Sequence, residues 1–263
     1  MRAYYYLAKM KLLVSLTYRF EVLTTLGTNL ILIISNYYLW KTAYKGIDSV
    51  KGVNESQMIT YSMISVLLNS LFNINFEQRL QDRIEKGDVV IDFIRPVNFL
   101  LCNLAEDIGE TLSSALSKLL PLLLFIVTFI HSSLPLSPLA FVLFLISVIF
   151  SFIILWLLSA IIALLSFWIL QLGHLSGIKD GIIFILSGRI IPLWLFPESL
   201  QKIISFLPFQ YIYQTPLSIY IGKLQFKQAL ASMVLQLVWI VLLGLIVCFE
   251  WSRAKKQVLI QGG

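Results

Sequence analysis

The sequence predicts an all-α integral membrane protein with six transmembrane helices, and three observations lead to this fold class. Of the 263 residues, 58% are hydrophobic and 13% are charged, whereas soluble globular domains are about 45–50% apolar and about 25% charged. No Asp, Glu, Lys or Arg occurs from Leu119 to Ile178. Six apolar segments fill the chain and leave no room for a soluble domain, so residues 1–263 are predicted to form one membrane domain.

The first 76 residues predict an amphipathic helix followed by two spans. Residues 1–21 intersperse basic side chains with tyrosine and leucine, a pattern that suits a helix lying in the headgroup layer of an anionic leaflet. The spans are expected at residues 22–41 and 57–76, since about 20 residues at about 1.5 Å per residue cross a hydrocarbon core of about 30 Å. A polar loop, residues 43–56, joins them.

Residues 77–98 (EQRLQDRIEKGDVVIDFIRPVN) form the main polar stretch between apolar segments. Its charges recur at helical spacing, Gly87 ends this periodicity, and a run of β-branched and aromatic residues follows before Pro96. We therefore expect a short helix that ends in an apolar knob, a shape suited to docking on a partner that supplies energy. The residues expected to make that contact are Arg79, Asp82, Arg83, Glu85, Lys86, Asp88 and Asp92.

Four further spans are expected, at residues 112–130, 139–170, 178–196 and 229–249, and Gly188, Arg189 and Pro192 interrupt the third of these. The segment 139–170 would measure about 48 Å as one helix, which exceeds the bilayer core, so it must tilt, break or project. The proline-containing turn before it, residues 131–138, predicts an antiparallel hairpin of the two adjoining spans. A basic tail, Glu250–Lys256, follows the last span.

Three acids share a helical face ahead of the third of the six spans, and they are Glu106, Asp107 and Glu110. One reading is a cation site. We favour a solvated helix start, in which the acids balance the charge of the neighbouring arginines and lie near a helix N-terminus. Lys179 and Asp180 are adjacent in sequence and therefore point to different helix faces, which indicates anchoring at the inner interface.

Of the residues in this chain, Arg189 has the highest expected cost of burial in a membrane, because its charge interrupts an apolar segment that contains no acidic neighbour. Two interpretations are open. In a functional role, Arg189 meets an anionic headgroup or lines an exit path. In a structural role, its side chain extends to the outer interface. Beyond it, prolines divide residues 197–223 into two short amphipathic pieces that are expected to lie or dip at the far interface. The residues expected at a translocation path or outer gate are Arg189, Pro192, Pro197, Pro208 and Tyr211.

Six spans place both termini on one side of the membrane. That side carries eleven basic residues against six on the other, so the positive-inside rule predicts that the termini and residues 77–98 are cytoplasmic. The net charge of +6 comes from lysines and arginines that flank the membrane, and no nucleic-acid binding is expected. The N-terminus lacks the ordered regions of a signal peptide, so no cleavage is expected.

No arrangement of residues predicts catalysis, a cofactor or a metal site in this chain. His131 and His174 are predicted on opposite sides of the membrane, and Cys102 and Cys248 have no second thiol at metal or redox spacing. Neither HExxH nor GxxxxGK[ST] occurs in the sequence. The chain is therefore not expected to be an enzyme or to hydrolyse ATP by itself.

Three segments, Glu85–Asn98, Ser187–Pro197 and Leu207–Lys223, together with the pattern of spans, resemble the membrane subunit of bacterial type-two ATP-binding-cassette (ABC-2) exporters. The resemblance implies that Arg79–Asp92 is a coupling helix seated in an ATPase subunit, that residues 1–21 are an interface helix, and that residues 197–223 cap the exit. It also implies a second permease, identical or related, with ATP and Mg bound by the partner ATPase in a bacterial cell membrane.

The function predicted from these features is export of an amphipathic substrate, such as a drug, peptide, lipid or glycan. Three alternatives stay open. An ion-coupled secondary transporter would need a carboxylate or histidine near the bilayer midplane. A membrane-embedded enzyme of lipid metabolism would need a catalytic cluster. A scaffold or immunity protein without transport activity would need neither, and the sequence does not identify the substrate.

Overall fold

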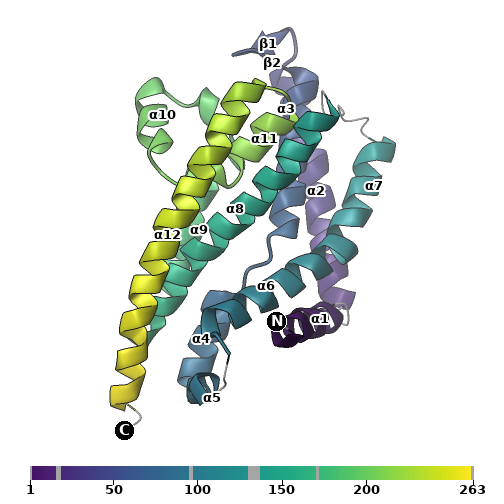
Figure 1. Ribbon diagram of the computed structural model, residues 1–263. Helices are drawn as coiled ribbons and strands as arrows, with labels where there is room; N and C mark the ends of the chain where they lie inside the picture. The colour runs from purple at the N-terminus through teal and green to yellow at the C-terminus, as the bar shows by residue number, and fades with distance from the viewer. Residues whose placement is uncertain (1, 16–18, 95–96, 130–136, 170–171, 262–263) are drawn as a thin grey trace.

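The computed structural model describes residues 2–15, 19–94, 97–129, 137–169 and 172–261, which form an elongated helical bundle (Figure 1). The α-helices of this described chain are α1 (Arg2–Ser15), α2 (Arg19–Ala43), α3 (Glu55–Leu71), α4 (Phe76–Glu85), α5 (Val89–Ile94), α6 (Phe99–Ser114), α7 (Leu120–Phe129), α8 (Pro138–Leu164), α9 (Gly173–Leu186), α10 (Glu198–Ser205), α11 (Gln214–Tyr220) and α12 (Phe226–Gln261). The predicted turn at residues 131–138, including His131, lies almost wholly outside the described residues, as do Arg95 and Pro96.

Five helical stretches of the described chain are long and apolar enough to cross a membrane, and they are Phe20–Ala43, Glu55–Glu85, Phe99–Phe129, Pro138–Phe167 and Phe226–Gln257. The second stretch contains both α3 and α4, between which residues 72–75 leave the helix. These stretches confirm that the protein is an all-helical integral membrane protein.

The predicted fifth span, residues 178–196, is not one continuous helix. α9 starts earlier, at Gly173, and ends at Leu186, because Gly188 takes a left-handed conformation (φ +77°) and Pro192 follows. The 14 residues of α9 measure about 21 Å at about 1.5 Å per residue, which is less than the bilayer core. Within the described residues, five rather than six helices are therefore long enough to cross.

The predicted span at residues 112–130 is the upper part of a longer, bent helix. α6 begins at Phe99, where the Asn98 side chain accepts a hydrogen bond from the Leu101 N–H at 3.1 Å. A π-helical turn, Ala115–Leu119, separates α6 from α7. Pro121 has no N–H to bond the preceding turn, which explains why the helix widens there. α6 consequently runs obliquely across the bundle, whereas α7 is more upright (Figure 1).

Two other helix ends bear on the sequence prediction. α8 ends at Leu164 in a 3-10 turn, η2 (Leu165–Phe167), so the overlong segment 139–170 breaks, which is one of the three outcomes predicted. The predicted basic tail, residues 250–256, belongs to α12, because no glycine or proline interrupts its helical pattern.

The loop between α2 and α3 contains a small hairpin of β1 (Ser49–Val50) and β2 (Val53–Asn54), which are antiparallel. Lys51 and Gly52 both have positive φ, 48° and 78°, as a two-residue hairpin turn requires. Asn54 then caps α3, since its side chain accepts from the Gln57 N–H at 2.8 Å.

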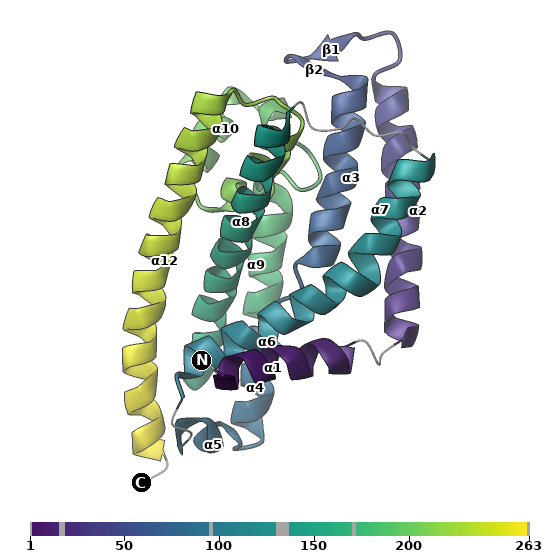
Figure 2. The same ribbon diagram turned by 45° about the vertical axis from the view of Figure 1, so that its right-hand side comes forward.

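α8 is the central helix of the bundle and packs against α12, α11 and α4. α2 lies on α3, and the second apolar core between α2, α3 and α7 contains Ile33, Met63, Leu122 and Ile126. α1 lies across the base of the bundle, against α6 (Figure 2). The same end of the bundle holds α4, α5 and the end of α12, so the structure has a charged base and a more apolar upper part.

Candidate functional site: the charged network around α4

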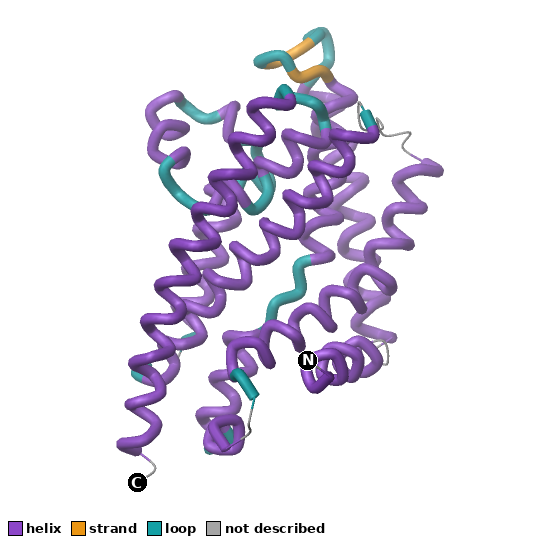
Figure 3. Tube along the Cα trace, viewed as in Figure 1, coloured by secondary structure: helices purple, strands orange, loops and turns teal. Residues whose placement is uncertain are grey.

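α4 hangs below α3 on a short loop, residues 72–75, and is followed by α5 (Figure 3). Gly87 ends α4 in a left-handed conformation (φ +77°), as its position in the sequence predicts. α4 has one face that points away from the bundle and one that points toward it. The side chains that this part of the chain exposes include those of Gln78, Asp82, Glu85, Lys86, Asp88 and Ile91.

Arg79 lies on the inward face of α4 and reaches all three acids of α6. Its Nη1 lies 2.8 Å from Asp107 Oδ1 and 3.3 Å from Glu110 Oε1, and its Nε lies 3.3 Å from Glu106 Oε2. A guanidinium offers several donors in a fixed plane, which suits one group shared among several carboxylates. Arg79 thus joins α4 to α6 by charge-assisted contacts.

Arg83 lies one turn further along α4 and extends the same network. Its Nη2 lies 3.2 Å from Glu106 Oε1, and its Nη1 lies 3.0 Å from Asp92 Oδ2 in α5. Because Arg79 and Arg83 are four residues apart, as are Glu106 and Glu110, the two helices match along one turn. Of the seven residues predicted to contact a partner, Arg79, Arg83 and Asp92 face inward and the other four are exposed.

The acids of α6 are buried, so the expectation of a solvated helix start is wrong. Glu106, Asp107 and Glu110 are 6%, 0% and 7% exposed. Their remaining oxygens are also occupied, since Trp156 Nε1 of α8 donates to Asp107 at 3.0 Å and Asn75 donates to Glu110 at 2.7 Å. The expectation that these acids balance the charge of the neighbouring arginines is confirmed. The guanidinium groups of Arg79 and Arg83 occupy the position that a bound cation would take.

α1 is fixed to the same acids. Lys11 Nζ lies 3.6 Å from Glu106 and 3.4 Å from Glu110, and the Tyr4 hydroxyl accepts a hydrogen bond from the Asn98 N–H at 3.1 Å. The two helices cross so closely at Gly109 that an added Cβ would collide with the Ala8 carbonyl. α1 is therefore held by both charge and shape.

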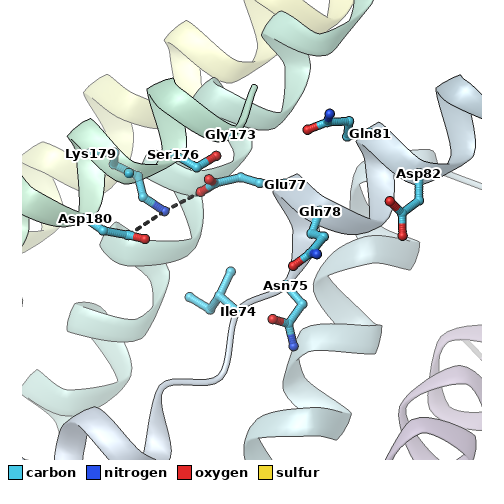
Figure 4. Close-up of a pocket in the computed structure, with 11 residues that line it drawn as sticks. Ile74, Asn75, Glu77, Gln78, Gln81, Asp82, Gly173, Ser176, Lys179 and Asp180 are labelled. Atoms are coloured by element: carbon cyan, nitrogen blue, oxygen red, sulfur yellow. Dashed lines mark hydrogen bonds and ion pairs between the residues drawn. The ribbon is translucent and has the colours of Figure 1, made fainter. Parts of the chain in front are cut away.

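A separate ion pair joins α4 to α9. Glu77 of α4 pairs with Lys179 of α9 (Figure 4). Lys179 also donates to Ser159 Oγ of α8 at 2.9 Å. Lys179 is thus bonded inside the bundle, whereas the adjacent Asp180 has a side chain that is 71% exposed. The pair borders a cavity of about 530 Å³ between α4 and α9, which is also lined by Asp82 and Ser176. Among the described residues, no group of three or more His, Cys, Asp or Glu is placed to hold a metal ion.

A family model described as "ABC-2 family transporter protein" matches residues 30–262, which is most of the chain. The chain belongs to the ABC-2 transporter family. Neither a curated protein nor a solved structure gives a significant match. Members of this family are membrane components of ABC transporters without an ATPase motif of their own, and they normally work with an ABC ATPase. The resemblance read from the sequence is therefore confirmed at the level of the family.

In this ABC-2 family protein, the residues predicted at an outer gate do not form one cluster. Pro197 is exposed at the start of α10, whereas Pro192 and Pro208 are buried in the turns on either side of it. The Tyr211 carbonyl accepts hydrogen bonds from Ser151 Oγ and from Gln236 Nε2, both at 2.9 Å. Tyr211 therefore contributes to packing between α8 and α12.

The turn after α9 is tied to α3 and α11. The Tyr61 hydroxyl lies 2.6 Å from the Gly188 carbonyl, and Ser65 Oγ donates to the Arg189 carbonyl at 2.5 Å. A Cβ at Gly188 would collide with the Gln214 side chain. Arg189 itself is partly buried, and its guanidinium lies 5.6 Å from the centre of the Phe184 ring.

The two short pieces predicted within residues 197–223 correspond to α10 and α11. α10 exposes most of its residues, but α11 is packed among α3, α8 and α12 and buries Thr215 through Ile219. Lys223 follows α11 and lies 4.5 Å from the Trp194 ring centre. Burial lowers the pKa of Lys223, and the nearby Lys51 lowers it further.

The sequence prediction missed Lys11, Asn75, Trp156 and the Glu77–Lys179 pair as members of the network. A signal existed for part of it, because the spacing of Arg79 and Arg83 matches that of Glu106 and Glu110. Trp156 had no such signal, since it lies in a charge-free apolar run. Its role depends on which helix lies beside α8.

Proposed function

We propose that this chain is the permease of an ATP-driven exporter and that a separate ATPase subunit docks on the exposed face of α4 and α5. The observation that carries the proposal is the division of α4 into two faces. Asp82, Glu85 and Lys86 are exposed, whereas Arg79 and Arg83 are fixed to α6. Movement of a subunit docked on the exposed face would therefore be transmitted to the membrane helices through the buried contacts of Arg79 and Arg83.

Energy coupling requires a contact whose free energy differs between two states of the membrane domain. α4 has direct ionic contacts to α6 through Arg79 and to α9 through Glu77, and α6 in turn holds α1. The buried network favours movement of these elements as one unit, because breaking a buried ion pair costs about 3–5 kcal/mol. The elements that meet at α4 are thus suited to transmit the motion of a partner.

In this proposal the base of the bundle is cytoplasmic, as the excess of basic residues there favours. α9 and the turns and short helices after it return the chain to the opposite end, where α12 begins, and make the sixth crossing (Figure 1). α10 and α11 then lie toward the outer face. Two such permeases and two ATPase chains form the exporter of an amphipathic substrate in a bacterial cell membrane.

The test compares two exposed acids at opposite ends of the bundle. Asp82→Lys should lower the ATP hydrolysis that the permease stimulates in its co-expressed ATPase by about tenfold, because it reverses a charge on the docking face. Asp48→Lys, beside the β1–β2 hairpin, should leave hydrolysis unchanged. Membrane insertion of both variants should match the wild type. Equal hydrolysis rates for Asp82→Lys and wild type would overturn the docking face.

A further inference from the structure

A second cavity, of about 280 Å³, lies between α3, α8 and α9 and is lined by both polar and apolar side chains. Its polar lining includes Asn69, Asn73, Tyr213 and Arg189, and its apolar lining includes Phe72 and Ile183. Ile74, Lys179 and Asp180 line this cavity and also the larger one beside α4. The Glu77–Lys179 pair therefore stands at the wall between the two cavities.

Two cations, Lys179 and Arg189, line this cavity, and they differ in their contacts. Lys179 pairs with Glu77 and also lies 3.2 Å from Asp180, the acid in the cavity lining. Among the described residues, no carboxylate forms an ion pair with Arg189, whose guanidinium lies 5.6 Å from the centre of the Phe184 ring. An unpaired arginine between membrane helices is costly, which points to a role in binding.

We infer that this cavity binds the anionic headgroup of an amphiphile and that Arg189 is its charged contact. The inference rests on the proposed function, since it names the substrate class of the permease. A volume of about 280 Å³ holds a headgroup such as a phosphate with its linker, but not a whole drug-sized molecule. Phe72, Ile74 and Ile183 give the cavity apolar walls, which suit the start of an alkyl chain.

Asn69 and Tyr213 add neutral hydrogen-bonding groups to this cation. The Tyr213 hydroxyl donates to Asn69 Oδ1 at 3.5 Å, which orients the amide and leaves the Asn69 NH2 group to donate to a ligand oxygen. A guanidinium with neighbouring neutral donors is a recurrent arrangement for phosphate and carboxylate recognition. A cationic headgroup would instead be repelled by Arg189.

The test measures equilibrium binding of radiolabelled dodecyl phosphate to the purified full-length chain in dodecyl maltoside micelles. Wild-type protein should bind it more tightly than dodecyltrimethylammonium, which has the same alkyl chain. Arg189→Gln should weaken dodecyl phosphate binding by about tenfold or more, because a charge-assisted contact is lost. Arg189→Lys should retain part of the affinity and show that the site has folded.

Arg253→Gln is the matched control. Arg253 also lies over a phenylalanine, 4.4 Å from the Phe249 ring centre, but it is exposed near the end of α12. Its variant should bind dodecyl phosphate as the wild type does. An equal loss in Arg253→Gln, or tighter binding of dodecyltrimethylammonium, would overturn the site.

Inorganic phosphate distinguishes an amphiphile from a free anion. At the same concentration it should displace little bound dodecyl phosphate, and equal displacement would overturn the assignment to an amphiphile. The assay contains no ATPase, so its failure leaves the docking of α4 untouched. Conversely, unchanged ATP hydrolysis in Asp82→Lys would leave a measured binding site in place.

Discussion

The base and the upper part of the bundle differ in the polar contacts that join their helices. At the base, Arg79 and Arg83 pair with the buried acids of α6. In the upper part, Gln236 of α12 is fully buried and bonds only neutral groups, among them Ser147 of α8 at 3.0 Å and the Tyr211 carbonyl at 2.9 Å. Ion pairs join the helices at the base, whereas neutral hydrogen bonds join them in the upper part, as is typical among membrane helices, where charge is costly.

α8 belongs to both regions. Its Trp156 donates to Asp107 in the charged network, and its Ser147 and Ser151 bond Gln236 and the Tyr211 carbonyl. In the function proposed above, this difference assigns two roles. The ionic contacts at the base would receive the motion of the partner, and α8, which contacts both regions, would carry it to the upper part.

The largest effect is expected from Arg79→Met, which breaks the ionic joint. The acids of α6 would lose their shared counter-charge inside the protein, at a cost of about 3–5 kcal/mol in the free energy of unfolding. Arg253→Met, at an exposed position, should change stability by less than about 0.5 kcal/mol. Thermal unfolding in detergent measures both. Similar unfolding temperatures for the two variants would mean that the network contributes little stability.

A smaller effect is expected from Gln236→Leu in the upper part. The substitution keeps the approximate volume but leaves the Tyr211 carbonyl and two serines short of partners, at a cost of about 1–3 kcal/mol. The same unfolding experiment should therefore rank it below Arg79→Met. A greater loss for Gln236→Leu than for Arg79→Met would reverse the comparison.

Substitutions at two helical glycines are expected to differ in sign, and the smallest effect of the series is expected at Gly244. Gly109→Ala forces α1 away from α6 and should cost about 1–3 kcal/mol through overpacking. Gly244→Ala in α12 meets nothing within 4 Å and should be neutral or stabilise the helix by about 0.5–1 kcal/mol. Protease sensitivity of α1 should rise only in Gly109→Ala. If it rises in neither variant, close packing does not hold α1.

The sequence predicted the elements that local chemistry determines. Gly87 ends α4 because glycine accepts positive φ without strain, and the prolines around residues 197–216 divide that segment into short helices as expected. The all-helical membrane class followed from composition alone, since no soluble core could accommodate the charge-free run. These features depend on neighbouring residues and little else.

The features that were missed depend on contacts between distant segments. The placement of α4 decides whether Glu106, Asp107 and Glu110 face water or a guanidinium. The periodicity of the sequence does not show where α4 packs. Residues 178–196 were predicted as a span interrupted at Gly188, Arg189 and Pro192, but the sequence did not show that Tyr61 and Gln214 bond to each other and that Tyr61 bonds to Gly188 at this turn. The side chains that stabilise this turn come from helices far away in the sequence.

The most direct test of the account separates docking of the ATPase from transmission of its motion. Glu77→Ala removes the inward link from α4 to Lys179 but leaves the exposed residues of α4 in place. In the co-purified complex, this variant should hold the ATPase as tightly as the wild type, while the ATP hydrolysis stimulated by the permease falls several-fold. Full stimulation by Glu77→Ala would contradict transmission through this contact, and loss of ATPase binding would contradict the division of α4 into two faces.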